Sequence, residues 1–368
     1  MIKLEELIHL NDRNIILKLK EKIDELADEL QKEIKIMEVC GTHTVSIRRN
    51  GIHSLLPTNV KMISGPGCPV CVTPASYIDN AIQLVEEKRA IVVTFGDMLK
   101  VPGTKGYSLS RFMGSGWVRV IYSPAEMLEI RKDTSKPVVF LGIGFETTVP
   151  TIASTFLRGV ENQLEDMYLY TSFKTVPPAL EALLADTESE IDAFLLPGHV
   201  SVILGMEPYR KVLERKNGIP GVIGGFEPVD IMLAIYKILK QLAEGRREVE
   251  NAYPRAVRGT GNPKARAVIE KLLEPGDELW RGLGKLPASG LRIRREYENI
   301  DAVVKFGLSE EYNYEPAGCL CAEVIQGKVA PNQCPHFAKD CIPEEPIGPC
   351  MVSSEGACAA YYRYGDIG

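Results

Sequence analysis

The stretch "VKMISGPGCPVCVTP", residues 60–74, contains a pattern that recurs through the first two thirds of the chain. A short apolar segment is followed by glycine and proline, then by reactive side chains, and a helical segment begins after Thr73. A strand that ends in such a turn and leads into a helix is the repeating unit of parallel sheets with crossover helices. This stretch therefore predicts an α/β fold, and it places Cys68 and Cys71 at the end of a strand.

The same unit repeats along the chain, because short apolar runs alternate with segments of helical periodicity. The expected strands cover residues 34–39, 60–64, 90–95, 118–122, 137–143, 167–172, 192–197 and 221–225. The expected helices cover residues 12–33, 74–88, 124–132, 149–163, 177–186 and 228–244. In the first of these helices Asp12 is placed to cap the N-terminus, and its apolar residues lie on one face.

We expect two doubly wound, Rossmann-like parallel-sheet domains, residues 34–136 and 137–235, separated by the polar run "RKDTSK" at the end of the first. Residues 1–33 are expected to form a helix packed on this body. Residues 236–368 lose the alternation and are rich in proline, glycine and cysteine, which predicts a smaller, irregular domain.

Composition narrows the class of protein. The 368 residues are 45% hydrophobic and carry a net charge of −6, which argues against a dedicated nucleic-acid binder. We find no apolar run of membrane-spanning length and no signal peptide, so we expect a cytoplasmic protein. "GIGFE" (142–146) lacks the third glycine of a dinucleotide fingerprint, and no Walker A sequence is present, so nucleotide binding is not supported. Since thiols stay reduced in the cytoplasm, nine cysteines favour metal or redox chemistry.

The predicted strands end in chemically unusual loops. They are "CGTHT" (40–44), "GPGCPVC" (65–71), "FGDMLKVPG" (95–103), "GFETTVP" (144–150), "PGHVSVI" (197–203) and "GGFEP" (224–228). Because the carboxyl ends of parallel strands form the binding edge, we expect two site edges facing each other across an interdomain cleft. The supporting side chains of this cleft are expected to be Thr42, Thr44, Asp97, Lys100, Glu146, Thr147, Thr148, His199 and Glu227.

Two of these loops carry thiols. Cys40 and His43 are spaced to share a metal ion or to let the imidazole assist thiol deprotonation. Cys68 and Cys71 precede a helix expected to begin with Thr73 as N-cap, and the positive end of a helix stabilises thiolates. The arrangement is typical of disulfide oxidoreductases, yet Cys40, His43, Cys68 and Cys71 also make a Cys₃His zinc set. From these residues alone both interpretations stay open.

Six further cysteines lie in the last 50 residues. Cys319, Cys334, Cys341 and Cys358 follow the spacing C-x14-C-x6-C-x16-C, and Cys321 and Cys350 are additional. A loop-rich segment of this kind builds little core, so thiolate–metal bonds are expected to hold it together. Four spread thiolates suit either structural zinc or a [4Fe–4S] cluster, and the spacing does not choose between them.

Taken in order, the six loop motifs and the C-x14-C-x6-C-x16-C ending make the sequence resemble the HypD family of hydrogenase maturation factors along essentially its whole length. The resemblance implies two α/β domains and a [4Fe–4S] domain, which act in the cytoplasm with the small chaperone HypC and with HypE. It implies that they build the Fe(CN)₂CO unit of [NiFe]-hydrogenases.

By the same resemblance, individual cysteines receive roles. Cys40 would bind the iron of Fe(CN)₂CO together with a cysteine of HypC, and His43 would lie close by. Cys68 and Cys71 would form a redox-active dithiol. The cluster ligands would be Cys319, Cys334, Cys341 and Cys358. Such a protein would be a redox scaffold more than a conventional enzyme.

Two other classes of function use the same cysteines. In a thiol–disulfide oxidoreductase of the ferredoxin:thioredoxin-reductase type, a cluster feeds a dithiol, and Cys40 is not needed for iron. In a zinc-stapled interaction protein, the cysteines are structural and no redox function exists. Infrared bands of bound cyanide and carbon monoxide distinguish the scaffold from the oxidoreductase. Metal analysis distinguishes it from the zinc-stapled protein.

Overall fold

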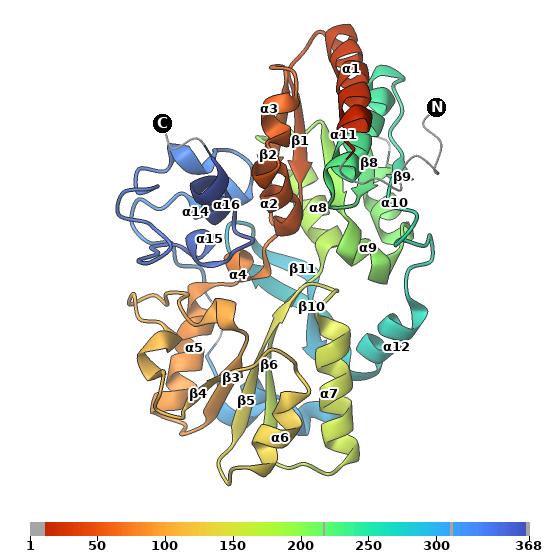
Figure 1. Ribbon diagram of the computed structural model, residues 1–368. Helices are drawn as coiled ribbons and strands as arrows, with labels where there is room; N and C mark the ends of the chain where they lie inside the picture. The colour runs from red at the N-terminus through yellow and green to blue at the C-terminus, as the bar shows by residue number, and fades with distance from the viewer. Residues whose placement is uncertain (1–11, 216–217, 310–311, 366–368) are drawn as a thin grey trace.

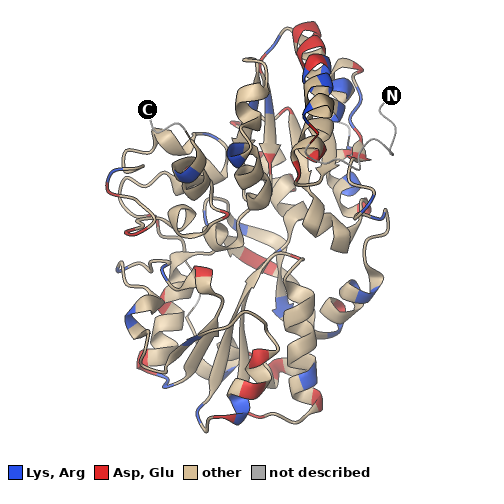
Figure 2. Cartoon of the chain, in the orientation of Figure 1, with Lys and Arg blue, Asp and Glu red and all other residues tan. Residues whose placement is uncertain are grey.

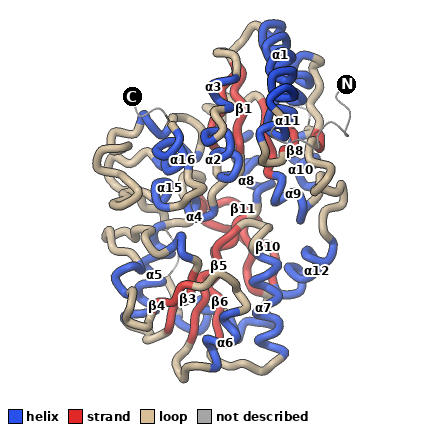
Figure 3. The backbone as a smooth tube through the Cα atoms, in the orientation of Figure 1, coloured by secondary structure: helices blue, strands red, loops and turns tan. Residues whose placement is uncertain are grey.

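Two sheets and a C-terminal segment make up the structure, a computed structural model that describes residues 12–215, 218–309 and 312–365. Figure 1 shows one sheet in the upper lobe, the other in the lower lobe, and the C-terminal segment beside both. Helices surround both sheets, whereas the C-terminal segment is mostly loop (Figure 3). The predicted class, α/β with two mainly parallel sheets and a cysteine-rich end, is confirmed.

All eight expected strands are present, with ends within two residues of the prediction. The strands are β1 (Ile34–Glu38), β2 (Val60–Ser64), β3 (Ile91–Thr94), β4 (Val118–Val120), β5 (Val138–Gly144), β6 (Met167–Lys174), β7 (Ala193–Pro197), β8 (Gly221–Gly224), β9 (Val249–Asn251), β10 (Leu273–Trp280) and β11 (Gly284–Ile293). The last three were not expected from the sequence.

The six expected helices are also present. In the two lobes the helices are α1 (Arg13–Leu30), α2 (Gly41–Arg49), α3 (Ile52–Leu55), α4 (Pro69–Val72), α5 (Ala75–Glu86), α6 (Glu126–Lys132), α7 (Val149–Glu161), α8 (Val176–Ala185), α9 (Gly198–Leu204), α10 (Glu207–Leu213), α11 (Pro228–Ala243) and α12 (Pro263–Leu272). Towards the C-terminus they are α13 (Ala302–Phe306), α14 (Cys321–Ile325), α15 (Pro349–Val352) and α16 (Ala357–Tyr364).

The sheets divide the chain differently from the predicted ranges 34–136 and 137–235. The upper sheet has the order β2-β1-β7-β8-β9, and the lower sheet has the order β10-β11-β6-β5-β3-β4. Each predicted range therefore contributes strands to both sheets. Apolar runs show where strands form but not which strands pair, because pairing depends on contacts between distant segments.

The region after residue 236 also differs from the prediction of a separate irregular domain. β9 joins the upper sheet in parallel, and the hairpin β10–β11 joins the lower sheet antiparallel to β6. The hairpin sequence contains prolines and glycines, and a bulge lies between Gly276 and Glu278. Such strands lack the apolar alternation by which strands are recognised in a sequence.

The N-terminal helix α1 packs on the upper lobe. The Asp12 carboxylate accepts hydrogen bonds from the backbone amides of Asn14 and Ile15, which confirms the predicted cap. Leu19 and Ile23 are fully buried in the core that also contains residues of α11, and Figure 1 shows the two helices side by side. Of the predicted segment 1–33, residues 1–11 lie outside the described residues.

Positions of charged residues of both signs are interspersed along the outer elements (Figure 2). In the basic stretch 244–258, Arg246 forms ion pairs with Glu244, Glu248 and Glu250. The charge of Arg246 is thus paired within this stretch. No helix among the residues that the structure describes has both the length and the apolar character needed to cross a membrane.

Candidate functional site

Each sheet has a switch point, where successive strands are added on opposite sides. It lies between β1 and β7 in the upper sheet and between β3 and β5 in the lower sheet. Ligands of open α/β sheets bind beside the carboxyl ends of the strands at such points. "CGTHT" and "PGHVSVI" follow β1 and β7, while "FGDMLKVPG" and "GFETTVP" follow β3 and β5. The topology therefore brings four of the six predicted loops to the two switch points.

The two strand edges share one core. Val39 after β1, Phe145 after β5 and Tyr209 on α10 are buried in the same cluster. Tyr209 is fully buried, and burial together with the nearby charges of Glu146 and Cys40 raises its pKa above the usual value. The loops that follow the upper and lower strands thus meet between the lobes.

Cys40 lies at the junction of β1 and α2. The "CGTHT" motif is not an isolated turn, because residues from Gly41 onward form the first turn of α2. Burial, together with the nearby Glu355 carboxylate, raises the pKa of the Cys40 thiol to about 11. A thiol with such a pKa is protonated at neutral pH, so it becomes a thiolate ligand when a metal ion displaces its proton.

Gly67 presses directly against the backbone of Cys40. The Gly41 amide donates a hydrogen bond to the Gly67 carbonyl at 3.0 Å. A Cβ atom on Gly67 would lie 2.3 Å from the Cys40 nitrogen and 2.5 Å from its Cα. Only glycine permits this approach. The second glycine of "GPGCPVC" is therefore the contact that joins the two thiol-bearing loops.

We predict that Gly67→Ala lowers the free energy of unfolding by about 1–3 kcal/mol, since a methyl group forced into packed backbone has that typical cost. Chemical denaturation measures this change. Gly259→Ala is the matched control, because a Cβ there meets no atom within 4 Å, and we expect a change of at most about 0.5 kcal/mol. Equal stability of the two variants would contradict the close approach.

Cys68 and Cys71 lie next to each other in a buried turn. Their Sγ atoms are at disulfide distance, their Cα atoms are 5.2 Å apart, and their side chains are 4% and 2% exposed. Cys68 is the N-cap of α4, and its sulfur accepts a hydrogen bond from the Cys71 amide at 3.3 Å. The two sulfurs are therefore close enough to form a disulfide.

The predicted helix start at Thr73 and Pro74 is wrong. A separate one-turn helix, α4, contains Cys71 and ends at Val72 with Thr73 as its C-cap, and Pro74 is the N-cap of α5. Pro69 at the first position of α4 supplies a helical φ angle, and Pro74 has no amide to continue the turn. The two prolines thus isolate the cysteine pair in its own helical turn.

His43 is fully buried on the first turn of α2. Its Nε2–H donates a hydrogen bond to the Gly225 carbonyl at 2.9 Å, and its ring stacks on Phe226 with centroids 4.6 Å apart. Burial lowers the pKa of His43 to about 4, so the ring is neutral at pH 7. Phe226 also stacks on His199 at 3.8 Å. The predicted His43 and His199 therefore flank one aromatic side chain from the loop after β8.

Two of the predicted cleft residues contact the Cys40 loop. Thr42 donates a hydrogen bond through its hydroxyl to the Glu355 carboxylate at 2.8 Å. The Thr44 hydroxyl donates to the Cys40 carbonyl at 3.4 Å and is buried. Both threonines therefore hold the backbone around Cys40, one of them through the C-terminal segment.

Other predicted cleft residues have local roles or lie open to solvent. Glu227 is the N-cap of α11 and forms a capping box with Asp230, so it stabilises a helix end. Thr148 is half-buried at the start of α7. The exposed predicted residues are Asp97, Lys100 and Thr147.

Glu146, in the loop that follows β5, is a deeply buried acidic residue. One carboxylate oxygen accepts a hydrogen bond from the Val176 amide at 2.9 Å. The other is buried and has no hydrogen-bond partner among the described residues. Burial raises the pKa of Glu146 to about 7.

We predict that Glu146→Gln stabilises the protein at pH 8 but not at pH 5. The raised folded-state pKa of Glu146 means that stability falls as pH rises from about 4.5 to about 7, because the unfolded chain releases this proton first. The expected gain at pH 8 is at most roughly 3 kcal/mol. Denaturation at both pH values measures it, and an equal effect at pH 5 and pH 8 would argue against a titrating Glu146.

The six C-terminal cysteines gather around one place. Cys319, Cys321, Cys334, Cys341 and Cys358 line a single apolar cavity together with Phe337 and Met351. Cys350 lies beside Cys321 and Cys358, close enough for their thiols to influence its own. Within the described ranges, no three His, Cys, Asp or Glu side chains surround a single ion position. His336 also lines this cavity, but the other potential donors there are sulfur, which suits a group that binds several thiolates rather than one hard cation.

A second cavity lies between the C-terminal cysteines and the Cys68–Cys71 pair. It is lined by Cys68, Cys71, Cys350 and Glu355, among others. Cys350 is 1% exposed, and the Cys71 sulfur lies 4.0 Å from the carbonyl oxygen of its neighbour Pro349. The C-terminal segment thus places a thiol beside the Cys68–Cys71 pair.

Sequence reasoning did not assign roles to Cys350 or Glu355. Cys350 is a cysteine outside the C-x14-C-x6-C-x16-C spacing, so its residue type drew attention to it. The sequence did not show which residues lie next to it in space. Glu355, in the stretch "SSEG", had no distinguishing signal. Both acquire their places only through the docking of the C-terminal segment on α2 and α4.

Comparisons with known proteins find relatives that match nearly the whole chain. The family model HypD, described as "Hydrogenase formation hypA family", matches residues 14–365. Hydrogenase maturation factor HypD2 of Bradyrhizobium diazoefficiens is 42% identical over 96% of this chain and 95% of the relative. Hydrogenase maturation factor HypD of Azotobacter vinelandii is 42% identical over 91% of this chain and 90% of the relative. The Escherichia coli HypD is 38% identical over 94% and 93%. The chain therefore belongs to the HypD family of hydrogenase maturation factors.

Proposed function

We propose that this chain is a redox-active scaffold on which the Fe(CN)₂CO unit of the [NiFe]-hydrogenase active site is assembled. The observation that carries the proposal is the packing of Gly67 against Cys40, which sets a buried cysteine pair beside a separate thiol at a switch point. A thiol–disulfide oxidoreductase needs the pair but has no use for Cys40. A scaffold needs both.

Cys40 is proposed as the iron ligand on this chain. Low-spin Fe(II) with cyanide and carbon monoxide is soft and suits a thiolate. The high pKa of Cys40 means that iron has to displace the thiol proton on binding. His43 has too low a pKa to be an effective base at pH 7, so its proposed part is to hold α2 against the loop at Gly225. Thr44 and the Thr42–Glu355 contact keep the Cys40 backbone in place.

The C-terminal cysteines are proposed to hold a [4Fe–4S] cluster, which the donor set fits, since the four predicted ligands all line one apolar cavity. These ligands are Cys319, Cys334, Cys341 and Cys358. When bound, such a cluster supplies one electron at a time. Cys68 and Cys71 then store two electrons as a dithiol, and Cys350 lies between them and the cluster ligands. The apolar lining formed by Phe337 and Met351 excludes water.

We propose two partners of the kinds that the resemblance implies, a small HypC-type chaperone that completes the iron site and a HypE-type cyanide donor. The loops between the lobes are the proposed meeting place, because one of them carries Cys40. We further propose that these proteins act together in the cytoplasm, where thiols are kept reduced.

Metal analysis of anaerobically purified protein tests the cluster. We expect iron and inorganic sulfide with the broad visible absorption of an iron–sulfur cluster, and loss of both in Cys334→Ala and Cys358→Ala. Each replacement removes one of four thiolate ligands. Zinc without iron would contradict the cluster and favour a zinc-stapled interaction protein.

A further inference from the structure

The tip of the β10–β11 hairpin comprises residues 280–284. It lies between α4, the helix that contains Cys71, and the C-terminal segment that carries the six further cysteines. On one side, the Arg281 amide donates a hydrogen bond to the Val72 carbonyl at 2.8 Å. On the other side, a Cβ atom on Gly282 would lie 3.2 Å from the Cα of Ala322, and the Gln326 side chain donates to the Gly282 carbonyl. One residue of this tip therefore contacts α4, and the next contacts α14.

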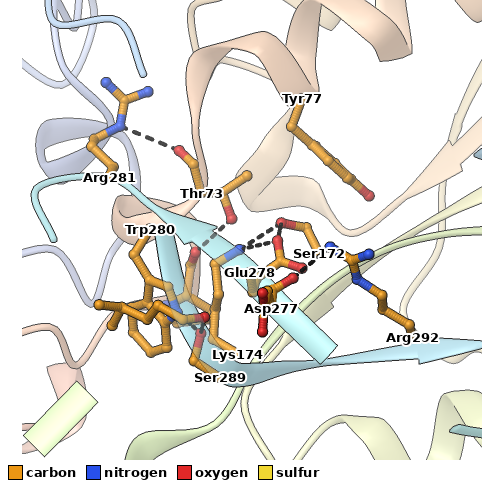
Figure 4. Close-up of polar contacts among 12 residues, drawn as sticks. Thr73, Tyr77, Ser172, Lys174, Asp277, Glu278, Trp280, Arg281, Ser289 and Arg292 are labelled. Atoms are coloured by element: carbon orange, nitrogen blue, oxygen red, sulfur yellow. Dashed lines mark hydrogen bonds and ion pairs between the residues drawn. The ribbon is translucent and has the colours of Figure 1, made fainter. Parts of the chain in front are cut away.

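Arg281 is a buried cation at this junction, with 1% of its surface exposed. Its Nε–H donates to the Thr73 carbonyl at 3.2 Å, and its Nη1 donates to the Tyr314 carbonyl at 3.1 Å and to Glu315 at 3.3 Å. Figure 4 shows the guanidinium directed at Thr73. Its Nη2 is buried and has no hydrogen-bond partner in the described part of the chain. Burying a charge with one donor unpaired is costly, so a positive charge here calls for a functional reason.

Strand residues at and next to the tip hold Arg281 in place. The Trp280 indole N–H donates to the Ser289 hydroxyl at 2.8 Å, and both residues are fully buried. The Lys174 ammonium pairs with Glu278 at 2.7 Å and also donates to Ser172 (Figure 4). These bonds tie β10 to β11 and to β6. The guanidinium is thus held by a hairpin that is itself tied to the lower sheet.

We infer that Arg281 is a positioning residue whose fixed positive charge shifts the equilibrium between the disulfide and the dithiol of Cys68 and Cys71 towards the dithiol. The inference rests on the redox role given to this pair in the proposed function. Reduction breaks the S–S bond, takes up two electrons, and leaves two sulfurs that each carry a negative charge or bind a proton. Arg281 donates hydrogen bonds to the carbonyls of the two residues that follow Cys71, through its amide and its Nε, so its charge lies at the end of the helical turn that contains this cysteine. In a buried site a nearby cation stabilises the thiolate and hence the reduced state.

Equilibration of the purified full-length protein in buffers of reduced and oxidised dithiothreitol tests the inference. In this reaction dithiothreitol closes to its cyclic disulfide as it passes two electrons and two protons to the protein. Alkylation and mass spectrometry of the peptide that contains Cys68 and Cys71 give the reduced fraction. We expect Arg281→Met to shift the equilibrium constant about tenfold towards the disulfide, which is about 30 mV for a two-electron couple.

Two further variants fix the sign of the effect. Arg281→Lys keeps the charge, so we expect a shift of less than about threefold. Glu315→Gln removes the carboxylate that partly offsets Arg281, so we expect a severalfold shift in the opposite direction, towards the dithiol. Glu315 is 30% exposed, which makes this variant safe for folding even where Arg281→Met is not. Arg255→Met, which breaks an ion pair with Asp230 in the upper lobe, is the control and should leave the equilibrium unchanged.

An unchanged equilibrium in a folded Arg281→Met variant would overturn the inference, as would a Glu315→Gln shift of zero or towards the disulfide. Failure of the proposed function looks different. In that case the wild-type Cys68–Cys71 pair would not interconvert between disulfide and dithiol in any of the buffers.

Discussion

Replacing Cys40 by alanine is expected to abolish the infrared bands of metal-bound cyanide and carbon monoxide in protein purified with its partner chaperone. Cys40 is the thiol at the upper switch point, and alanine offers no ligand to iron. We expect hydrogenase activity in cells to fall by more than about 100-fold, since even loss of a hydrogen-bond partner of a metal ligand costs about 10–100-fold. Infrared spectroscopy of the complex and an activity assay measure the two effects.

Ser46→Ala is the matched control for this experiment. Ser46 lies on the same helix, α2, and donates a hydrogen bond to the Phe226 carbonyl at 2.6 Å, so the variant disturbs the helix without removing a thiol. We expect its infrared bands to remain. Bands that persist in Cys40→Ala would refute the iron-ligand assignment and favour a thiol–disulfide oxidoreductase of the ferredoxin:thioredoxin-reductase type.

Replacing either cysteine of the pair, in Cys68→Ser or Cys71→Ser, is expected to abolish hydrogenase maturation while the fold stays intact. Serine has nearly the size of cysteine, so the buried turn is preserved, but a hydroxyl forms no disulfide and stores no electrons. Both side chains are less than 5% exposed, which excludes loss of a surface contact as the cause. Hydrogenase activity measures the effect, and circular dichroism beside it reports the fold.

The two single variants serve as checks on each other. A redox pair requires both sulfurs, so the two losses of activity should be equally deep, and the double variant should be no worse than either. Activity retained in both single variants would refute the dithiol role. A loss in only one of them would indicate a single essential thiol instead of a pair.

The strands of this fold were predictable where they are apolar on both faces. β5, with the sequence "VVFLGIG", is buried along its whole length and is recognisable without structural knowledge. β9, with the sequence "VEN", and the hairpin strands around Gly276 and Gly290 are not, because their stability comes from pairing with strands already in place. A sequence pattern therefore reveals a strand only when the side chains of that strand are themselves apolar and buried.

The candidate site was predictable in its chemistry but not in its contacts. Motifs at strand ends indicated where reactive groups gather, because parallel strands share one carboxyl edge. Their individual roles differ from that common expectation. Glu227 caps a helix, and His43 is a neutral ring held by Gly225. Such roles depend on neighbours that arrive from distant parts of the chain.

The sequence by itself determined the α/β class, the strand–motif–helix units and the nine thiols, since these follow from local periodicity and residue type. Only the tertiary structure decided which strands pair and which thiols are neighbours. Three contacts join segments far apart in the chain: that of Gly67 with Cys40, that of Cys350 with the cysteine pair, and the insertion of the β10–β11 tip between α4 and α14. Such contacts depend on the packing of the whole molecule. Each of these groups is buried by residues from distant parts of the chain, which its local sequence does not specify.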